Sequence, residues 1–165
     1  PYSLVASLCL FILCREGVRD LSSPSISNLV MDIYDKAIFV PVFSHIKIDE
    51  ICCGSAKVSL SIEPTRHLSK QGFVQSGVLT ALIDVASKVT GASVGVRAGT
   101  LSFSVNLTKG ISTCKIVEVN SIIKHHGRRT MVIASEIKDE TGFLIASALT
   151  TMSVDGFFDE IPRKW

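Results

Sequence analysis

The spacing of apolar residues changes along the chain and predicts where helices and strands lie. Between residues 28 and 40, apolar side chains recur every three or four positions, which is typical of an amphipathic helix that ends before Pro41. Residues 56–63 and 101–108 instead alternate between apolar and polar side chains. This period of two indicates strands with one face in water.

The segment between these strands, residues 73–94, predicts the longest helix because it lacks proline and carries apolar residues at helical spacing. Its other positions are also mostly apolar, so we expect a helix held inside a curved sheet. Glycines then separate β-branched runs at 116–123, 130–137 and 143–154, with a turn at 139–142. A helix, a hairpin, the long helix and a four-stranded meander together predict an α+β domain with one antiparallel sheet packed on that helix.

The first 24 residues are predicted to be separate from a domain at 25–165. They contain an apolar run at 4–14, whose length of about eleven residues falls short of the about twenty that a membrane span needs. Because the sequence begins with Pro1 and its first methionine is Met31, three interpretations stay open. The run is a leader or other segment outside the native domain, a packed or interfacial helix, or a targeting sequence.

Composition and charge narrow the class of protein. A length of 165 residues fits one domain, and 47% hydrophobic with 19% charged residues is typical of a folded chain. A net charge of +2 gives no strong field, which argues against nucleic acid as a partner. Five cysteines form neither an even disulfide framework nor a zinc pattern, so we expect reduced thiols and no metal. The expected location is cytoplasmic, or mitochondrial or elsewhere if the first segment is a targeting sequence.

The polar residues of the long helix share one stripe. Ser76, Thr80, Asp84 and Lys88 follow one another at four-residue steps. An ionised carboxylate is rarely placed in an apolar helix unless it is paired or functional, because removing a charge from water is costly. The spacing therefore leaves two interpretations open, an exposed ion pair between Asp84 and Lys88 or a functional carboxylate.

The segment 67–86, HLSKQGFVQSGVLTALIDVA, resembles the signature of hotdog-fold acyl-CoA thioesterases of the phenylacetate-degradation and thioesterase superfamily member 2 types. Their pattern has a His, an Asn two residues later, a Gly, a His-Gly-Gly triplet and, after seven more residues, an Asp within the central helix. The similarity covers residues 40–154 and includes 100–106, 127–129 and 139–148. It implies a single hotdog domain, in which an antiparallel sheet wraps around a long central helix.

The resemblance also implies a reaction, the hydrolysis of a fatty or aryl acyl-CoA to free acid and CoA. Asp84 matches the catalytic acid of the family, which acts as general base or nucleophile. Ser76, followed by Gly77, matches the position whose backbone N–H polarises the thioester carbonyl. Ser102 matches a polar residue on the following strand, and Ser69 matches the Asn that orients the water or the carboxylate.

The remaining implied contacts concern the substrate and a second chain. Gln75 replaces a family His and keeps a hydrogen-bonding side chain, and Thr80 lies on the same stripe as Asp84. Arg128 and Arg129 belong to a basic tip that is a candidate for the CoA phosphates, or is ordinary solvated surface.

In these enzymes the catalytic Asp faces a partner subunit, so the resemblance implies a homodimer or a dimer of dimers. It implies no cofactor besides the CoA of the substrate, and a place in lipid metabolism. The changes at Ser69 and Gln75-Ser76 leave a second function open, the binding of acyl-CoA without hydrolysis.

Overall fold

The computed structural model describes residues 26–37, 46–108, 110 and 114–161, so the predictions for the first 24 residues lie outside the described part of the chain. Within these ranges no helix combines the length and apolar character that crossing a membrane requires. The elements are α2 (Ile26–Ala37), β1 (Ile46–Cys52), β2 (Ser55–Ser61), α3 (Pro64–His67), α4 (Ser76–Ala92), β3 (Val96–Leu107), β4 (Ile116–His126), β5 (Thr130–Asp139) and β6 (Leu144–Phe157).

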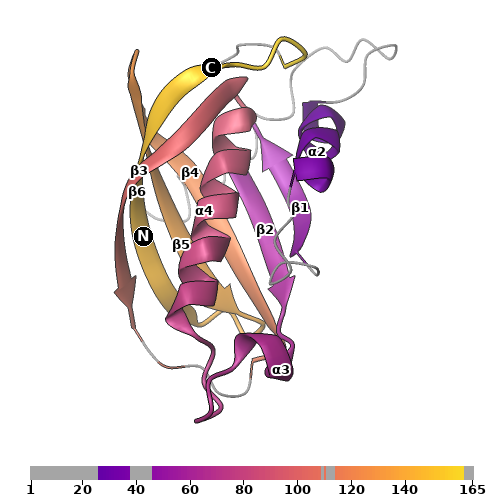
Figure 1. Ribbon diagram of the computed structural model, residues 1–165, viewed down its shortest axis with the longest axis vertical. Helices are drawn as coiled ribbons and strands as arrows, with labels where there is room; N and C mark the ends of the chain where they lie inside the picture. Colours follow the sequence, from indigo (N-terminus) through magenta and orange to yellow (C-terminus); the bar gives the residue numbers. More distant parts are fainter. Residues whose placement is uncertain (1–25, 38–45, 109, 111–113, 162–165) are drawn as a thin grey trace, which may run out of the picture.

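The strands of these residues form one antiparallel sheet in the order β1-β2-β4-β5-β6-β3, with α4 lying along its face (Figure 1). The predicted α+β class, with one antiparallel sheet packed on a long helix, is confirmed. The predicted four-stranded meander is wrong, because β3 pairs with β6 and β4 pairs with β2. Since α4 carries the chain across the sheet between β2 and β3, β3 enters at the far edge, where it has one neighbour.

The predicted turn at 139–142 is confirmed and joins β5 to β6. The Asp139 carboxylate accepts hydrogen bonds from the backbone N–H groups of Thr141 and Phe143, each at 2.9 Å. Gly142 has a φ of +84°, a conformation that costs glycine little and other residues more. This local bonding fixes the register in which β6 returns beside β5.

Helix α4 is held against the sheet by apolar packing and by buried hydroxyl groups. Its inner face includes Leu82 and Ile83, which are fully buried. Ser121 of β4 approaches the backbone oxygen of Ala86 at 3.2 Å and the Thr90 hydroxyl at 2.5 Å. Because a buried hydrogen bond is directional, these contacts fix the position of α4 along the sheet as well as its distance from it.

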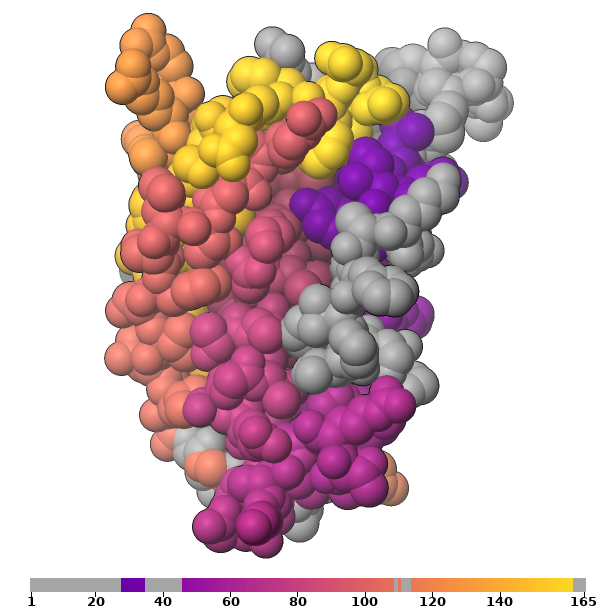
Figure 2. All heavy atoms as spheres, viewed as in Figure 1, coloured from indigo at the N-terminus to yellow at the C-terminus, as the bar shows by residue number. Residues whose placement is uncertain are grey.

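The outer face of α4 stays partly uncovered. Helix α2 packs against β1 and α4 through an apolar face on which Val30 is fully buried. Beside it, atoms of α4 are visible next to those of β3 (Figure 2). The polar stripe predicted from the sequence lies in this uncovered strip, where Ser76 and Gly77 are exposed and Asp84 is half-buried.

Leu82→Ala should lower the free energy of unfolding by about 2–5 kcal/mol, because the truncation leaves a cavity where α4 meets the sheet. Urea denaturation measures this loss. Leu149→Ala removes the same atoms from a side chain that is 48% exposed, and should cost less than about 1 kcal/mol. Equal losses in the two variants would contradict the placement of the core.

Candidate active site

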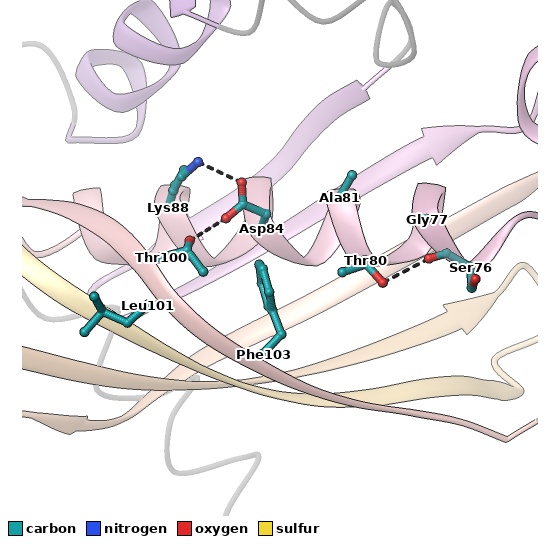
Figure 3. A pocket seen from close by; sticks show the side chains of 9 residues that line it. All are labelled: Ser76, Gly77, Thr80, Ala81, Asp84, Lys88, Thr100, Leu101 and Phe103. Atoms are coloured by element: carbon teal, nitrogen blue, oxygen red, sulfur yellow. Dashed lines mark hydrogen bonds and ion pairs between the residues drawn. The ribbon is translucent and has the colours of Figure 1, made fainter.

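An open pocket of about 690 Å³ lies between the outer face of α4 and the edge strand β3 (Figure 3). One wall is helical and carries small or polar side chains, and the other comes from β3 and is mostly apolar. Among the predicted site residues, Asp84, Ser76, Gly77 and Thr80 line it. The full lining consists of Ser76, Gly77, Thr80, Ala81, Asp84, Lys88, Thr100, Leu101 and Phe103.

The Asp84 carboxylate is held at both of its oxygens. The Thr100 hydroxyl donates a hydrogen bond to Oδ1 at 2.5 Å, and the Lys88 ammonium donates to Oδ2 at 2.7 Å. The side chains of Lys88 and Asp84 are 38% and 27% exposed, so the pair remains in contact with water. The ion pair allowed by the spacing is therefore formed, and it forms inside the pocket, so the two interpretations of Asp84 are compatible.

The start of α4 presents backbone donors to the same pocket. Ser76 is the first residue of the helix, and the preceding Gln75 is extended, with φ −69° and ψ 134°. Within the described part of the chain, the N–H groups of Ser76 and Gly77 have no protein acceptor. Unpaired N–H groups at a helix N-terminus give positive potential and favour an anionic oxygen.

Gln75 and Ser69 stabilise the loop before α4 and do not line the pocket. The Gln75 side chain donates to the backbone oxygen of Leu68 at 3.1 Å. The Ser69 hydroxyl accepts from the N–H of Phe73 at 3.3 Å, within a turn that Ser69 itself closes. Their hydrogen bonds position the helix start, while the roles implied by the resemblance stay predictions.

Ser102 lies on the opposite side of β3 from the pocket. It pairs with Thr151, which is flanked on β6 by the buried, helix-facing Thr150 and Met152. Because paired residues share a face, Ser102 points away from α4. The hydroxyl that reaches Asp84 from this strand is that of Thr100 instead. The alternating pattern gave no sign of this, because the strand contains a register shift between Thr100 and Ser102.

Arg128 and Arg129 are exposed at the tip between β4 and β5 and do not line the pocket. The backbone oxygen of Arg129 accepts from the N–H of Val154, and Val154 pairs with Ala98 of β3. Two strand spacings, about 10 Å, therefore separate the base of this tip from β3 near Thr100. The basic tip and the Thr100 end of the pocket lie at the same end of the sheet.

Tyr34 does not line the pocket, but it interacts electrostatically with Asp84, which the sequence analysis did not predict. It packs against the core from α2, and burial raises the pKa of its phenol, with a further increase from the negative charge of Asp84. An aromatic residue on an amphipathic helix gives no sequence signal beyond an ordinary core position. Its hydroxyl nevertheless lies within electrostatic reach of the carboxylate.

Solved structures share this architecture. A hypothetical thioesterase from Streptococcus pneumoniae, solved with coenzyme A, is 24% identical and has a TM-score of 0.72 over 78% of this chain and 99% of that chain. The PaaI protein from the phenylacetic acid degradation operon of E. coli is 17% identical, with a TM-score of 0.74 over 81% and 95%. The chain has the hotdog fold. The resemblance to hotdog-fold thioesterases is thus confirmed for the fold.

Other hotdog structures carry ligands or substitutions. A Streptococcus mutans protein bound to acetyl-CoA is 24% identical, with a TM-score of 0.68 over 74% of this chain and 98% of that chain. Two mutants of the S. pneumoniae protein, in which a threonine or an aspartate is replaced by alanine, are each 25% identical. Neither a family model nor a curated protein matches this chain.

Tyr34→Phe should reduce the loss of stability at alkaline pH. The pKa of Tyr34 is higher in the folded chain than in the unfolded chain, where it is about 10. The neutral phenol therefore contributes fully to the free energy of unfolding below about pH 10, and this contribution is lost as the pH rises further. Between pH 9 and pH 11 the wild-type chain should lose about 1 kcal/mol more free energy of unfolding than the variant. Urea denaturation at both pH values measures the difference. Equal losses would contradict the position of the phenol.

Proposed function

We propose that this chain is an acyl-CoA thioesterase that hydrolyses a fatty or aryl acyl-CoA to free acid and CoA. The observation that carries the proposal is the Asp84 carboxylate, oriented at both oxygens in an open pocket that also contains unpaired helix N–H groups. Two of the structures with this fold bind coenzyme A or acetyl-CoA, which supports the substrate class.

Asp84 takes one of two roles in this proposal. As a general base it removes a proton from water, whose oxygen bonds to the acyl carbon while the carbon–sulfur bond breaks and the thiolate takes up a proton. As a nucleophile its own oxygen attacks the acyl carbon and displaces the CoA thiolate, which takes up a proton. Water then hydrolyses the resulting anhydride to the free acid and restores the carboxylate. In the S. pneumoniae mutants, the substituted aspartate and threonine are separated by the same sixteen positions as Asp84 and Thr100. This spacing supports a joint role for the two residues.

The helix geometry supports a site shared by two chains. Asp84 lies eight residues after Ser76, which at 1.5 Å per residue is about 12 Å along α4. If the thioester carbonyl oxygen is bound to the Ser76 N–H, the carbonyl carbon lies too far from Asp84 of the same chain for this carboxylate to attack it directly. A homodimer whose α4 helices face each other and run antiparallel would bring the N-terminus of one helix beside the carboxylate of the other. Such dimers can pair again into tetramers.

Arg128 and Arg129 are proposed to contact the CoA phosphates. They are exposed, carry planar guanidinium groups suited to phosphate, and lie at the Thr100 end of the sheet. A place in lipid metabolism follows if the acyl group is fatty.

A second function, binding of acyl-CoA without efficient hydrolysis, is favoured by one observation. The Ser69 hydroxyl accepts a hydrogen bond within its own turn and does not line the pocket, and it has one donor where the Asn amide of the thioesterase pattern has two.

Asp84→Asn should lower kcat by at least about 100-fold, because it removes the base or nucleophile and keeps the shape of the side chain. Release of free thiol from short, medium, long and aryl acyl-CoAs measures turnover in both proteins. Circular dichroism confirms that the variant is folded. An Asp84→Asn protein with wild-type turnover would contradict the mechanism. Saturable CoA binding by a wild-type chain that releases no thiol would support the binding function instead.

Ser76→Pro should also abolish turnover, because proline removes the N–H group proposed to hold the oxyanion. Proline suits the first position of a helix, and the extended Gln75 before it has the conformation that a residue preceding proline adopts. Ser76→Ala keeps the N–H and should lose far less activity. Similar losses in the two variants would contradict the role of the backbone donor.

Mixing the two inactive variants tests the shared site. When Asp84→Asn and Ser76→Pro chains are unfolded together and refolded, random pairing makes about half of the dimers mixed, each with one intact site. The mixture should regain about a quarter of the wild-type turnover. A mixture as inactive as either variant alone would contradict a site built from two chains.

A further inference from the structure

A β-bulge turns three residues of β3 toward the pocket. On a regular strand, neighbouring side chains point to opposite faces, so Thr100 and Leu101 could not both line one cavity. Here Thr100 pairs with Met152 and Ser102 pairs with Thr151, which leaves Leu101 as an extra residue without a partner. Thr100, Leu101 and Phe103 consequently all line the pocket, as Figure 3 shows.

The bulge gives the pocket an apolar wall beside the reacting group. Leu101 is 60% exposed and Phe103 is 39% exposed, although both are large apolar side chains. Across the pocket, α4 contributes Gly77, which has no side chain, and Ala81, which has only a methyl group, so this wall leaves room for a ligand. Exposed apolar surface in a pocket gains free energy when an apolar group covers it. An apolar acyl group is the part of the proposed substrate that fits this wall.

We propose that Leu101 is a specificity-determining residue, which contacts the acyl carbons next to the thioester and selects for apolar acyl groups. The proposal rests on the proposed acyl-CoA function. Leu101 directly follows Thr100, whose hydroxyl binds Asp84, and both residues line the same pocket. Phe103 extends the same wall toward the start of α4 (Figure 3).

Leu101→Ala should lower the preference for a longer acyl chain. The measurement is the ratio of kcat/KM for hexanoyl-CoA to kcat/KM for acetyl-CoA, because acetyl-CoA lacks the carbons that the wall would contact. We expect the ratio to fall by about tenfold. The ratio does not depend on the fraction of active protein, so partial unfolding or weaker dimerisation does not imitate the effect.

Two further variants serve as controls. Leu149→Ala truncates a leucine that is 48% exposed but pairs with Ser104 on the far face of the sheet, and it should leave the ratio unchanged. Leu101→Met keeps an apolar side chain of similar volume and should retain most of the preference. An unchanged ratio in Leu101→Ala, with turnover still present, overturns this inference and leaves the proposed function standing.

A binding measurement separates this inference from hydrolysis. In an Asp84→Asn background, calorimetry gives the Kd of hexanoyl-CoA relative to that of CoA, with and without Leu101→Ala. If Leu101 contacts the acyl chain, Leu101→Ala should lower the affinity for hexanoyl-CoA relative to CoA by about tenfold. Equal relative affinities in the two proteins overturn the inference. Because no turnover is involved, failure of the hydrolytic function does not affect this result.

Discussion

The packing of α4 on the sheet is the constraint on which the rest of the structure depends. Fully buried residues such as Leu82 and Ile83 occupy the inner face, and Ser121 bonds the helix to β4. Because the inner face is fixed, the outer stripe is fixed as well, and half-buried Asp84 faces the pocket beside edge strand β3. A half-buried carboxylate keeps part of its contact with water, and the hydrogen bonds from Thr100 and Lys88 offset part of the cost of removing the rest.

The edge position of β3 has a related consequence. A strand in the middle of the sheet could not accommodate an extra residue without disturbing two neighbours, whereas β3 has only β6 beside it. The bulge at Leu101 directs the Thr100 hydroxyl to Asp84 and still lets Phe103 face the helix. Strand β3, which can contain a bulge because it lies at the edge of the sheet, therefore also forms one wall of the pocket.

The helices and strands were predicted well, because an element that buries one face has apolar residues at a regular spacing, and this spacing can be seen in the sequence of the segment itself. The predicted meander was wrong, since alternation identifies a strand but not its neighbours. Asp84 was found because a charge in an apolar helix is conspicuous. Thr100 was missed because a bulge changes the face of the sheet to which the following side chains point, and nothing in the residue composition indicates a bulge. Ser102, which was expected at the site, points away from α4. Tyr34 comes from another helix, and its approach to Asp84 depends on tertiary packing.

The pairing of Asp84 with Lys88 does not close the site. Both side chains are more than a quarter exposed, and such pairs four residues apart on a helix contribute only about 0.3–0.5 kcal/mol. A ligand can therefore displace the Lys88 ammonium at small cost, while the Thr100 hydroxyl continues to orient the carboxylate from β3. Until then the ammonium compensates the charge of Asp84, so an apolar group entering beside Leu101 does not face an isolated negative charge. The same residues thus combine a reactive carboxylate with a pocket wall suited to an apolar ligand.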